Sequence, residues 1–73
     1  MDEQRNAILD AAETLFLRKG LENTTMGDIA EETGIHRATI YRYFADRDPI
    51  AFEIGVRMLK EISLTAGYLE ASG

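Results

Sequence analysis

The most constraining feature of the sequence is the segment from Thr25 to Phe44, in which two short helical patterns flank one glycine. Thr25 can cap the first of these helices, and Asp28 three residues later completes a capping-box pattern. Gly34 follows the last periodic position, where a left-handed backbone conformation favours glycine. A second helix is then expected over Arg37–Phe44. Two short helices around such a turn predict a helix-turn-helix, which places its second helix in the major groove of DNA.

The segment before this unit also predicts a helix. Asp2–Lys19 has apolar residues at spacings of three and four, and Gly20 follows as a stop signal. The apolar stripe consists of Ile8, Ala11, Ala12, Leu15 and Phe16. We expect this helix to pack against the helix-turn-helix.

A fourth helix is expected beyond Phe44. Asp48 is its expected N-cap, with Pro49 at the first helical position, where a missing N–H costs nothing; Asp46 is the alternative cap. Gly67 can end it. Its apolar positions are Ile50, Ile54, Met58, Leu59, Ile62 and Leu69. Together the patterns predict an all-α fold, a three-helix bundle with a homeodomain-like helix-turn-helix plus a fourth helix that links onward.

The composition fits one small domain. The chain has 73 residues, 45% of them hydrophobic, and a single proline, which suits a compact helical domain. It has no cysteine and one histidine, so neither a disulfide nor a metal site based on thiolates is expected. No apolar run approaches the length of a transmembrane helix, and the acidic start differs from that of a signal peptide. We therefore expect a cytoplasmic protein without a metal or another cofactor.

The net charge of −5 argues against nucleic-acid binding if it is taken as a bulk number. Its distribution weakens this objection. Residues 36–47 contain three arginines and one acid, Asp46, whereas acidic residues gather on the first helix and at Glu31 and Glu32. A positive edge on an acidic body can still bind phosphate, with weaker long-range attraction.

The sequence also resembles the TetR/AcrR family of bacterial transcriptional regulators over roughly residues 2–62. The residues that carry the resemblance are Ile8, Ala11, Ala12, Phe16, Gly20, Thr24, Thr25, Ile29, Ala30, Gly34, Ile35, Ala38, Thr39, Ile40, Tyr41, Tyr43 and Phe44. The resemblance implies a sequence-specific DNA-binding regulator, most often a repressor. Its DNA-binding domain would span residues 2–62, with the helix-turn-helix at residues 25–44.

The same resemblance implies a second helical domain, which this chain is expected to lack. Residues 63–73 would begin the connection to it. In the family that domain binds a small-molecule effector and forms the homodimer, so that two helix-turn-helix units hold a palindromic operator. For the present chain the expected partner is double-stranded DNA, read in the major groove, and no membrane partner is expected.

Four residues are candidates for contact with base edges. Arg37 can hold guanine as a bidentate fork, Thr39 offers a hydroxyl and a methyl group, and Ala38 is small enough to approach a thymine methyl. Met26 is a weaker candidate for a groove edge. The alternative for Arg37 is a solvated surface arginine.

Five residues are candidates for the DNA backbone. The resemblance implies that the hydroxyls of Tyr41 and Tyr43 donate to phosphates and that Arg47 clamps the backbone. Thr25 is expected to cap its helix and to donate to a phosphate, because a helix N-terminus attracts anions. Arg42 is a weaker phosphate candidate. The alternative for the tyrosines is a half-buried ring whose hydroxyl points to water.

His36 departs from the family pattern, in which a small polar cap is usual. A neutral imidazole could accept the capping bond, and a protonated one would attract phosphate. No nucleophile–base pair accompanies it, so an enzyme is not expected. The alternative function is an acidic helical protein-interaction module that uses the apolar face of the fourth helix, provided that this face is exposed.

Overall fold

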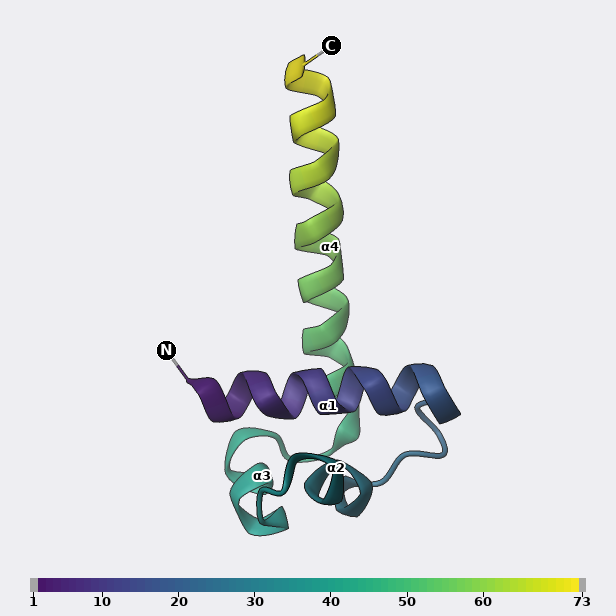
Figure 1. Cartoon of the computed structure of the whole chain (residues 1–73), viewed down its shortest axis with the longest axis vertical. Helices are drawn as coiled ribbons and strands as arrows, with labels where there is room; N and C mark the ends of the chain where they lie inside the picture. The colour runs from purple at the N-terminus through teal and green to yellow at the C-terminus, as the bar shows by residue number, and fades with distance from the viewer. Residues whose placement is uncertain (1, 73) are drawn as a thin grey trace.

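A computed structural model describes the backbone of residues 2–72 and the side chains of residues 2–62 (Figure 1). The described chain forms four helices, which are α1 (Glu3–Lys19), α2 (Met26–Thr33), α3 (Arg37–Tyr43) and α4 (Arg47–Ser72). Helix α1 packs against α2 and α4, and α2 packs against α3. Figure 1 shows α2 and α3 on one side of α1, while α4 extends away on the other side. The predicted all-α fold with a helix-turn-helix is confirmed.

Local signals fix both ends of α1. The side chain of Asp2 accepts a hydrogen bond from the backbone N–H of Arg5 at 3.3 Å, which caps the first turn. At the other end Gly20 has φ 87°, a conformation that side chains with a Cβ rarely adopt, and its N–H donates to the Phe16 carbonyl at 2.9 Å. Helix α1 therefore ends where the sequence predicts.

The helix-turn-helix has the predicted caps. The Thr25 hydroxyl accepts from the Asp28 N–H at 3.0 Å, and the Asp28 carboxylate accepts from the Thr25 N–H at 3.0 Å, so the capping box is complete. Gly34 is left-handed, with φ 76° and ψ 6°, and its N–H donates to the Ala30 carbonyl. The turn is closed by the Thr33 hydroxyl, which accepts from the Ile35 N–H at 3.0 Å.

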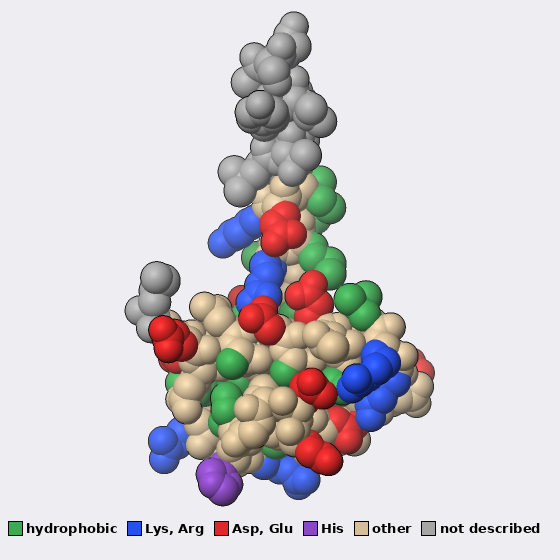
Figure 2. Space-filling view, in the orientation of Figure 1, with side chains coloured by type: hydrophobic (Ala, Val, Ile, Leu, Met, Phe, Trp, Pro, Cys, Tyr) green, Lys and Arg blue, Asp and Glu red, His purple; other side chains and the backbone are tan. Residues whose placement is uncertain are grey.

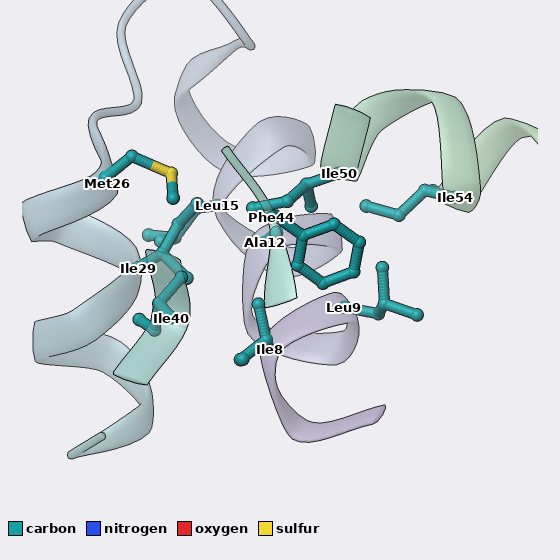
Figure 3. Close-up of a cluster of buried hydrophobic side chains, with 10 residues drawn as sticks. All are labelled: Ile8, Leu9, Ala12, Leu15, Met26, Ile29, Ile40, Phe44, Ile50 and Ile54. Atoms are coloured by element: carbon teal, nitrogen blue, oxygen red, sulfur yellow. The ribbon is translucent and has the colours of Figure 1, made fainter. Parts of the chain in front are cut away.

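The core lies where the four helices meet (Figure 3). Its buried members are Ile8, Leu9, Ala12, Leu15, Met26, Ile29, Ile40, Phe44, Ile50 and Ile54. Leu9 and Met26 were not expected there, whereas Phe16 and Ile35 pack against the cluster while remaining partly exposed. The core thus uses one face of each helix, and among the described side chains of α4 it includes Ile50 and Ile54.

Helix α4 begins earlier than predicted. Its first residue is Arg47, so the predicted start with Asp48 as cap and Pro49 at the first helical position is wrong. Asp46 directly precedes the helix, and its carboxylate accepts from the Arg47 N–H at 2.8 Å. Pro49 lies within the first turn of α4, where backbone N–H groups have no intrahelical acceptor. A proline is therefore tolerated whether the helix begins after Asp46 or after Asp48. The backbone remains helical through Gly67 to Ser72, so Gly67 does not end the helix.

The apolar pattern of α4 divides into two parts. Ile50 and Ile54 are buried, whereas Met58, Leu59 and Ile62 are exposed. Leu69, which the pattern also includes, lies outside the described side chains. The helix therefore anchors itself to the bundle at its start and presents apolar side chains to solvent farther along.

Candidate nucleic-acid interface

The first turn of α3 lies on the surface, at the end of the molecule remote from α4's C-terminal half (Figure 1). Arg37 and Ala38 are exposed and Thr39 is half-buried, while Ile40 behind them is buried in the core. Figure 2 shows the single histidine, His36, in purple at this end, with blue basic side chains on both sides of it. The structure therefore holds the three predicted base-contacting side chains on one short, accessible turn.

A surface hollow of about 470 Å³ lies between the start of α2 and α3. Its lining residues are Thr24, Thr25, Met26, Gly27, Arg37, Tyr41, Asp46 and Arg47. They include two arginines and one carboxylate, and that carboxylate accepts from the Arg47 N–H. The hollow thus combines cationic side chains with hydroxyl donors, which is a chemistry suited to a phosphate.

The N-terminus of α2 opens into this hollow. The first N–H groups of a helix lack intrahelical acceptors, and the helix dipole adds partial positive charge at this end. The Thr25 hydroxyl accepts from the Asp28 N–H, so its own hydrogen remains able to donate outward. An anion in the hollow would therefore meet donors from the backbone as well as from side chains.

Arg47 is tied to the protein as well as facing the hollow. Its Nη1 donates to the backbone carbonyls of Glu22 and Thr24, both at 2.9 Å. These bonds fix the link between α1 and α2 to the first residue of α4. Nε and Nη2 are the atoms that remain for an external acceptor. Arg47 is consequently a structural brace of the α2 N-terminus in addition to a candidate phosphate contact.

The two tyrosines differ in their surroundings. Tyr41 lines the hollow and is 47% exposed. The Tyr43 hydroxyl lies instead 3.1 Å from a carboxylate oxygen of Asp2 and 3.0 Å from the side-chain oxygen of Gln4. The bond to Asp2 raises the pKa of Tyr43, because it stabilises the protonated hydroxyl. The structure therefore separates Tyr43 from the hollow and joins it to the start of α1.

Three further predicted residues are placed as follows. His36 is the N-cap residue of α3 by position, but its side chain makes no capping hydrogen bond, so the predicted imidazole cap is wrong. Met26 is buried in the core at 6% exposure, which leaves its backbone rather than its side chain for a contact at a groove edge. Arg42 is exposed in the last turn of α3.

Three residues that line the hollow were missed by the sequence interpretation. Thr24 is fully buried and its hydroxyl donates to the Gly20 carbonyl at 2.8 Å. Asp46 supports the start of α4, and Gly27 is the second residue of α2. A glycine lowers the stability of a short helix, so its presence in the sequence can indicate that close packing at this position requires it.

The opposite side of α2 is held by ion pairs. Lys19 Nζ lies 2.7 Å from a carboxylate oxygen of Asp28, and this bond lowers the pKa of Asp28 to about 2, with further help from the Thr25 backbone N–H. Arg18 pairs with Glu32 at 3.4 Å. Acidic and basic side chains therefore neutralise each other on this side, in contrast with the hollow.

Neither a metal site nor a membrane-spanning helix is present among the described residues. Within residues 2–62, no three His, Cys, Asp or Glu side chains are grouped closely enough to hold a metal ion. No described helix combines the length and apolar character needed to cross a bilayer.

Comparison with known proteins gives a consistent family. A model of bacterial regulatory proteins of the tetR family matches residues 8–54. The uncharacterized HTH-type transcriptional regulator YfiR of Bacillus subtilis is 47% identical over 64% of this chain and 23% of its own length. The HTH-type transcriptional regulators AcrR of Shigella flexneri and HbdR of Aromatoleum sp. are each 40% identical over 71% of this chain, and over 24% and 23% of their own lengths. The chain thus spans about a quarter of the length of these relatives. It belongs to the tetR family of bacterial regulatory proteins.

Proposed function

We propose that this chain binds double-stranded DNA in a sequence-specific way and regulates transcription, with the first turn of α3 in the major groove. The observation that carries the proposal is the exposed first turn of α3 beside a hollow lined by arginine, tyrosine and threonine. The relatives, which are named as HTH-type transcriptional regulators, support it. No catalytic role is proposed.

Base recognition falls to Arg37, Ala38 and Thr39. The guanidinium of Arg37 matches the O6 and N7 acceptors of guanine, while Ala38 and Thr39 suit apolar or hydroxyl contacts with neighbouring bases. The exposure of Arg37 and Ala38 and the partial exposure of Thr39 at the start of α3 support these roles. Each good bidentate contact contributes about 1–3 kcal/mol of discrimination against the wrong base.

Backbone contacts fall to Thr25, Tyr41, Arg42 and Arg47, with a phosphate in or beside the hollow. Such contacts position the protein without reading sequence. His36, when protonated, would add a further phosphate contact. Tyr43 remains a weaker proposal, because a phosphate there would approach the Asp2 carboxylate.

For the whole protein we propose a cytoplasmic repressor that acts as a homodimer on a palindromic operator. Residues 2–62 would form the DNA-binding domain, and residues 63–73 would lead to a domain that holds a small-molecule effector. Two such units would read half-sites about 34–36 Å apart, or at multiples of that distance.

The test is a titration of this chain against duplexes selected from a randomised pool, repeated over a range of salt. Phosphate contacts make the logarithm of the binding constant fall linearly with the logarithm of salt concentration. Arg42→Gln should make this slope shallower by about 1. The matched control is Arg18→Gln, which removes the same charge from the ion-paired side of α2 and should leave the slope nearly unchanged. A salt-independent or undetectable interaction would overturn the proposal.

A specific observation favours a protein contact as a second function. Phe52, Leu59 and Ile62 on α4 are 72%, 64% and 64% exposed. Exposed apolar side chains on one helix are typical of surfaces that another protein surface covers. Leu59 and Ile62 lie farther along α4, on the part that extends away from α3 (Figure 1), so a partner there and DNA at α3 would be compatible.

A further inference from the structure

The backbone conformation at position 27 does not require a glycine. Gly27 lies second in α2, and the positive φ angles among the described glycines belong to Gly20 and Gly34. A glycine inside a helix is less favourable than an alanine, because the glycine backbone loses more conformational freedom on folding. Its presence in so short a helix therefore calls for a packing explanation.

The explanation is the side chain of Arg37. A Cβ atom built on Gly27 would lie 2.6 Å from Nη2 and 3.4 Å from Cζ of Arg37. The first distance is far below van der Waals contact, so the guanidinium fills the space that a side chain at position 27 would need. The same Cβ would lie 3.6 Å from Oγ1 of Thr25, which is ordinary contact. The conflict is thus with Arg37 alone among these neighbours.

This contact restricts a side chain that is otherwise long, exposed and flexible. Ordering an arginine side chain is costly, because arginine loses more rotamer freedom than most other side chains. A guanidinium that already lies beside Gly27 at the start of α2 has less of that freedom to lose when it binds DNA. Since Arg37 is the proposed guanine contact, its orientation bears directly on sequence preference.

We propose that Gly27 is a specificity-determining residue, which positions Arg37 for base recognition by leaving its own side-chain space to the guanidinium. The proposal rests on the proposed DNA-binding function and extends it to a residue that need not touch a base. It predicts that a single added methyl group at position 27 relaxes the sequence preference without unfolding the domain.

The experiment is a double-mutant cycle with Gly27→Ala and Arg37→Ala. The probe is a duplex that the wild-type chain selects from a randomised pool, together with its single base-pair variants. We expect Arg37→Ala to reduce discrimination at one base pair by about 5- to 150-fold. Gly27→Ala should reduce discrimination at that same base pair by roughly threefold or more, and should have no further effect when Arg37 is already alanine.

The matched control is Gly55→Ala in α4, where a Cβ atom meets nothing within 4 Å. It makes the same chemical change in a helix and should leave discrimination unchanged. Thermal unfolding of Gly27→Ala should occur at the same or a higher temperature than in the wild-type chain, since the displaced atoms are the end of a flexible side chain and alanine favours helix. Loss of preference with intact folding is the expected result.

Three results would overturn the inference while the proposed function stands. Unchanged preference in Gly27→Ala would show that the contact does not orient Arg37 for DNA. An equal loss in the Arg37→Ala background would show that the new methyl group meets DNA itself. NMR relaxation of the Arg37 Nε–H group in the chain without DNA gives an independent readout, and equal mobility in wild type and Gly27→Ala would also overturn it. Failure of the wild-type chain to select any duplex would instead overturn the proposed function and the inference together.

Discussion

The Tyr43 hydroxyl lies 3.1 Å from the carboxylate of Asp2, a residue 41 positions earlier in the chain. This contact joins the end of α3 to the N-cap of α1, because the same carboxylate oxygen also accepts from the Arg5 N–H. It gives Tyr43 a role inside the protein, whereas Tyr41 faces the hollow. The two tyrosines should therefore respond differently to removal of the hydroxyl.

Tyr41→Phe should lower DNA affinity by a similar factor for all duplexes, since a phosphate contact carries no sequence information. Tyr43→Phe should lower the free energy of unfolding, because it removes the hydrogen bond to Asp2, and should change DNA affinity less. Binding titrations on two unrelated duplexes and urea denaturation measure these quantities. A larger affinity loss in Tyr43→Phe than in Tyr41→Phe would contradict the assignment.

Arg37→Ala should differ from both tyrosine variants by relaxing the preference at one base pair. The expected cost on the preferred duplex is about 1–3 kcal/mol. Binding to the wild-type-selected duplex and to its single base-pair variants measures it. If Arg37→Ala lowered the affinity for every duplex by the same factor, as expected for Tyr41→Phe, Arg37 would not be a base contact.

Gly34→Val should destabilise the domain, because the left-handed conformation at φ 76° is costly for a β-branched residue. A Cβ atom there meets nothing within 4 Å, so the cost comes from the backbone alone, on the order of 1–2 kcal/mol or more. Gly55→Ala serves as the control and should stabilise α4 by about 0.5–1 kcal/mol. An unchanged unfolding midpoint for Gly34→Val would contradict the left-handed turn.

Asp28→Asn should destabilise the domain at neutral pH and not at low pH. The folded-state pKa of Asp28 is about 2, below the ordinary value of 3.8, so its carboxylate contributes stability above pH 3.8 that is lost as the pH falls toward 2. Asparagine keeps the capping acceptor but removes the charge that pairs with Lys19. Urea denaturation between pH 2 and pH 7 should show the gap between wild type and variant closing below about pH 4.

The control for this prediction is Glu31→Gln, an exposed neighbour on the same helix. It removes one negative charge without the bond to Lys19 and should show a smaller gap at neutral pH. A gap for Asp28→Asn that persists at pH 2 would mean that the cap geometry, rather than the ion pair, had been lost.

Features that depend on near neighbours could be predicted from the sequence. The capping box of Thr25 and Asp28 and the glycine at position 34 involve residues a few positions apart, and the structure has them as expected. The start of α4 was mistaken because Pro49 fits any position in a first helical turn. Gly67 was read as a stop although a single glycine only weakens a helix.

Features that depend on packing between helices could not be predicted. The burial of Met26, the bonds of Arg47 to the carbonyls of Glu22 and Thr24, and the contact between Gly27 and Arg37 all require the angle between elements. The angles between helices are set by how all the core side chains pack together. The apolar periodicity of a single helix does not determine them. The candidate residues on α3 were therefore accessible to sequence reasoning, and the hollow that accompanies them was not.

Because the described core residues of α4 lie near its start, the helical bundle can fold early during synthesis of the chain. The last described residue of the core is Ile54, and the last described ion pair with α1 is that of Arg57 with Asp10 and Glu13. During synthesis the chain grows from its N-terminus at about 5–20 residues per second, and units fold as they emerge. Once residue 57 has left the ribosome, the contacts that fix α3 against α1 and α2 are all available. Helices α1, α2 and α3 can thus fold against the start of α4 while later residues are still being added.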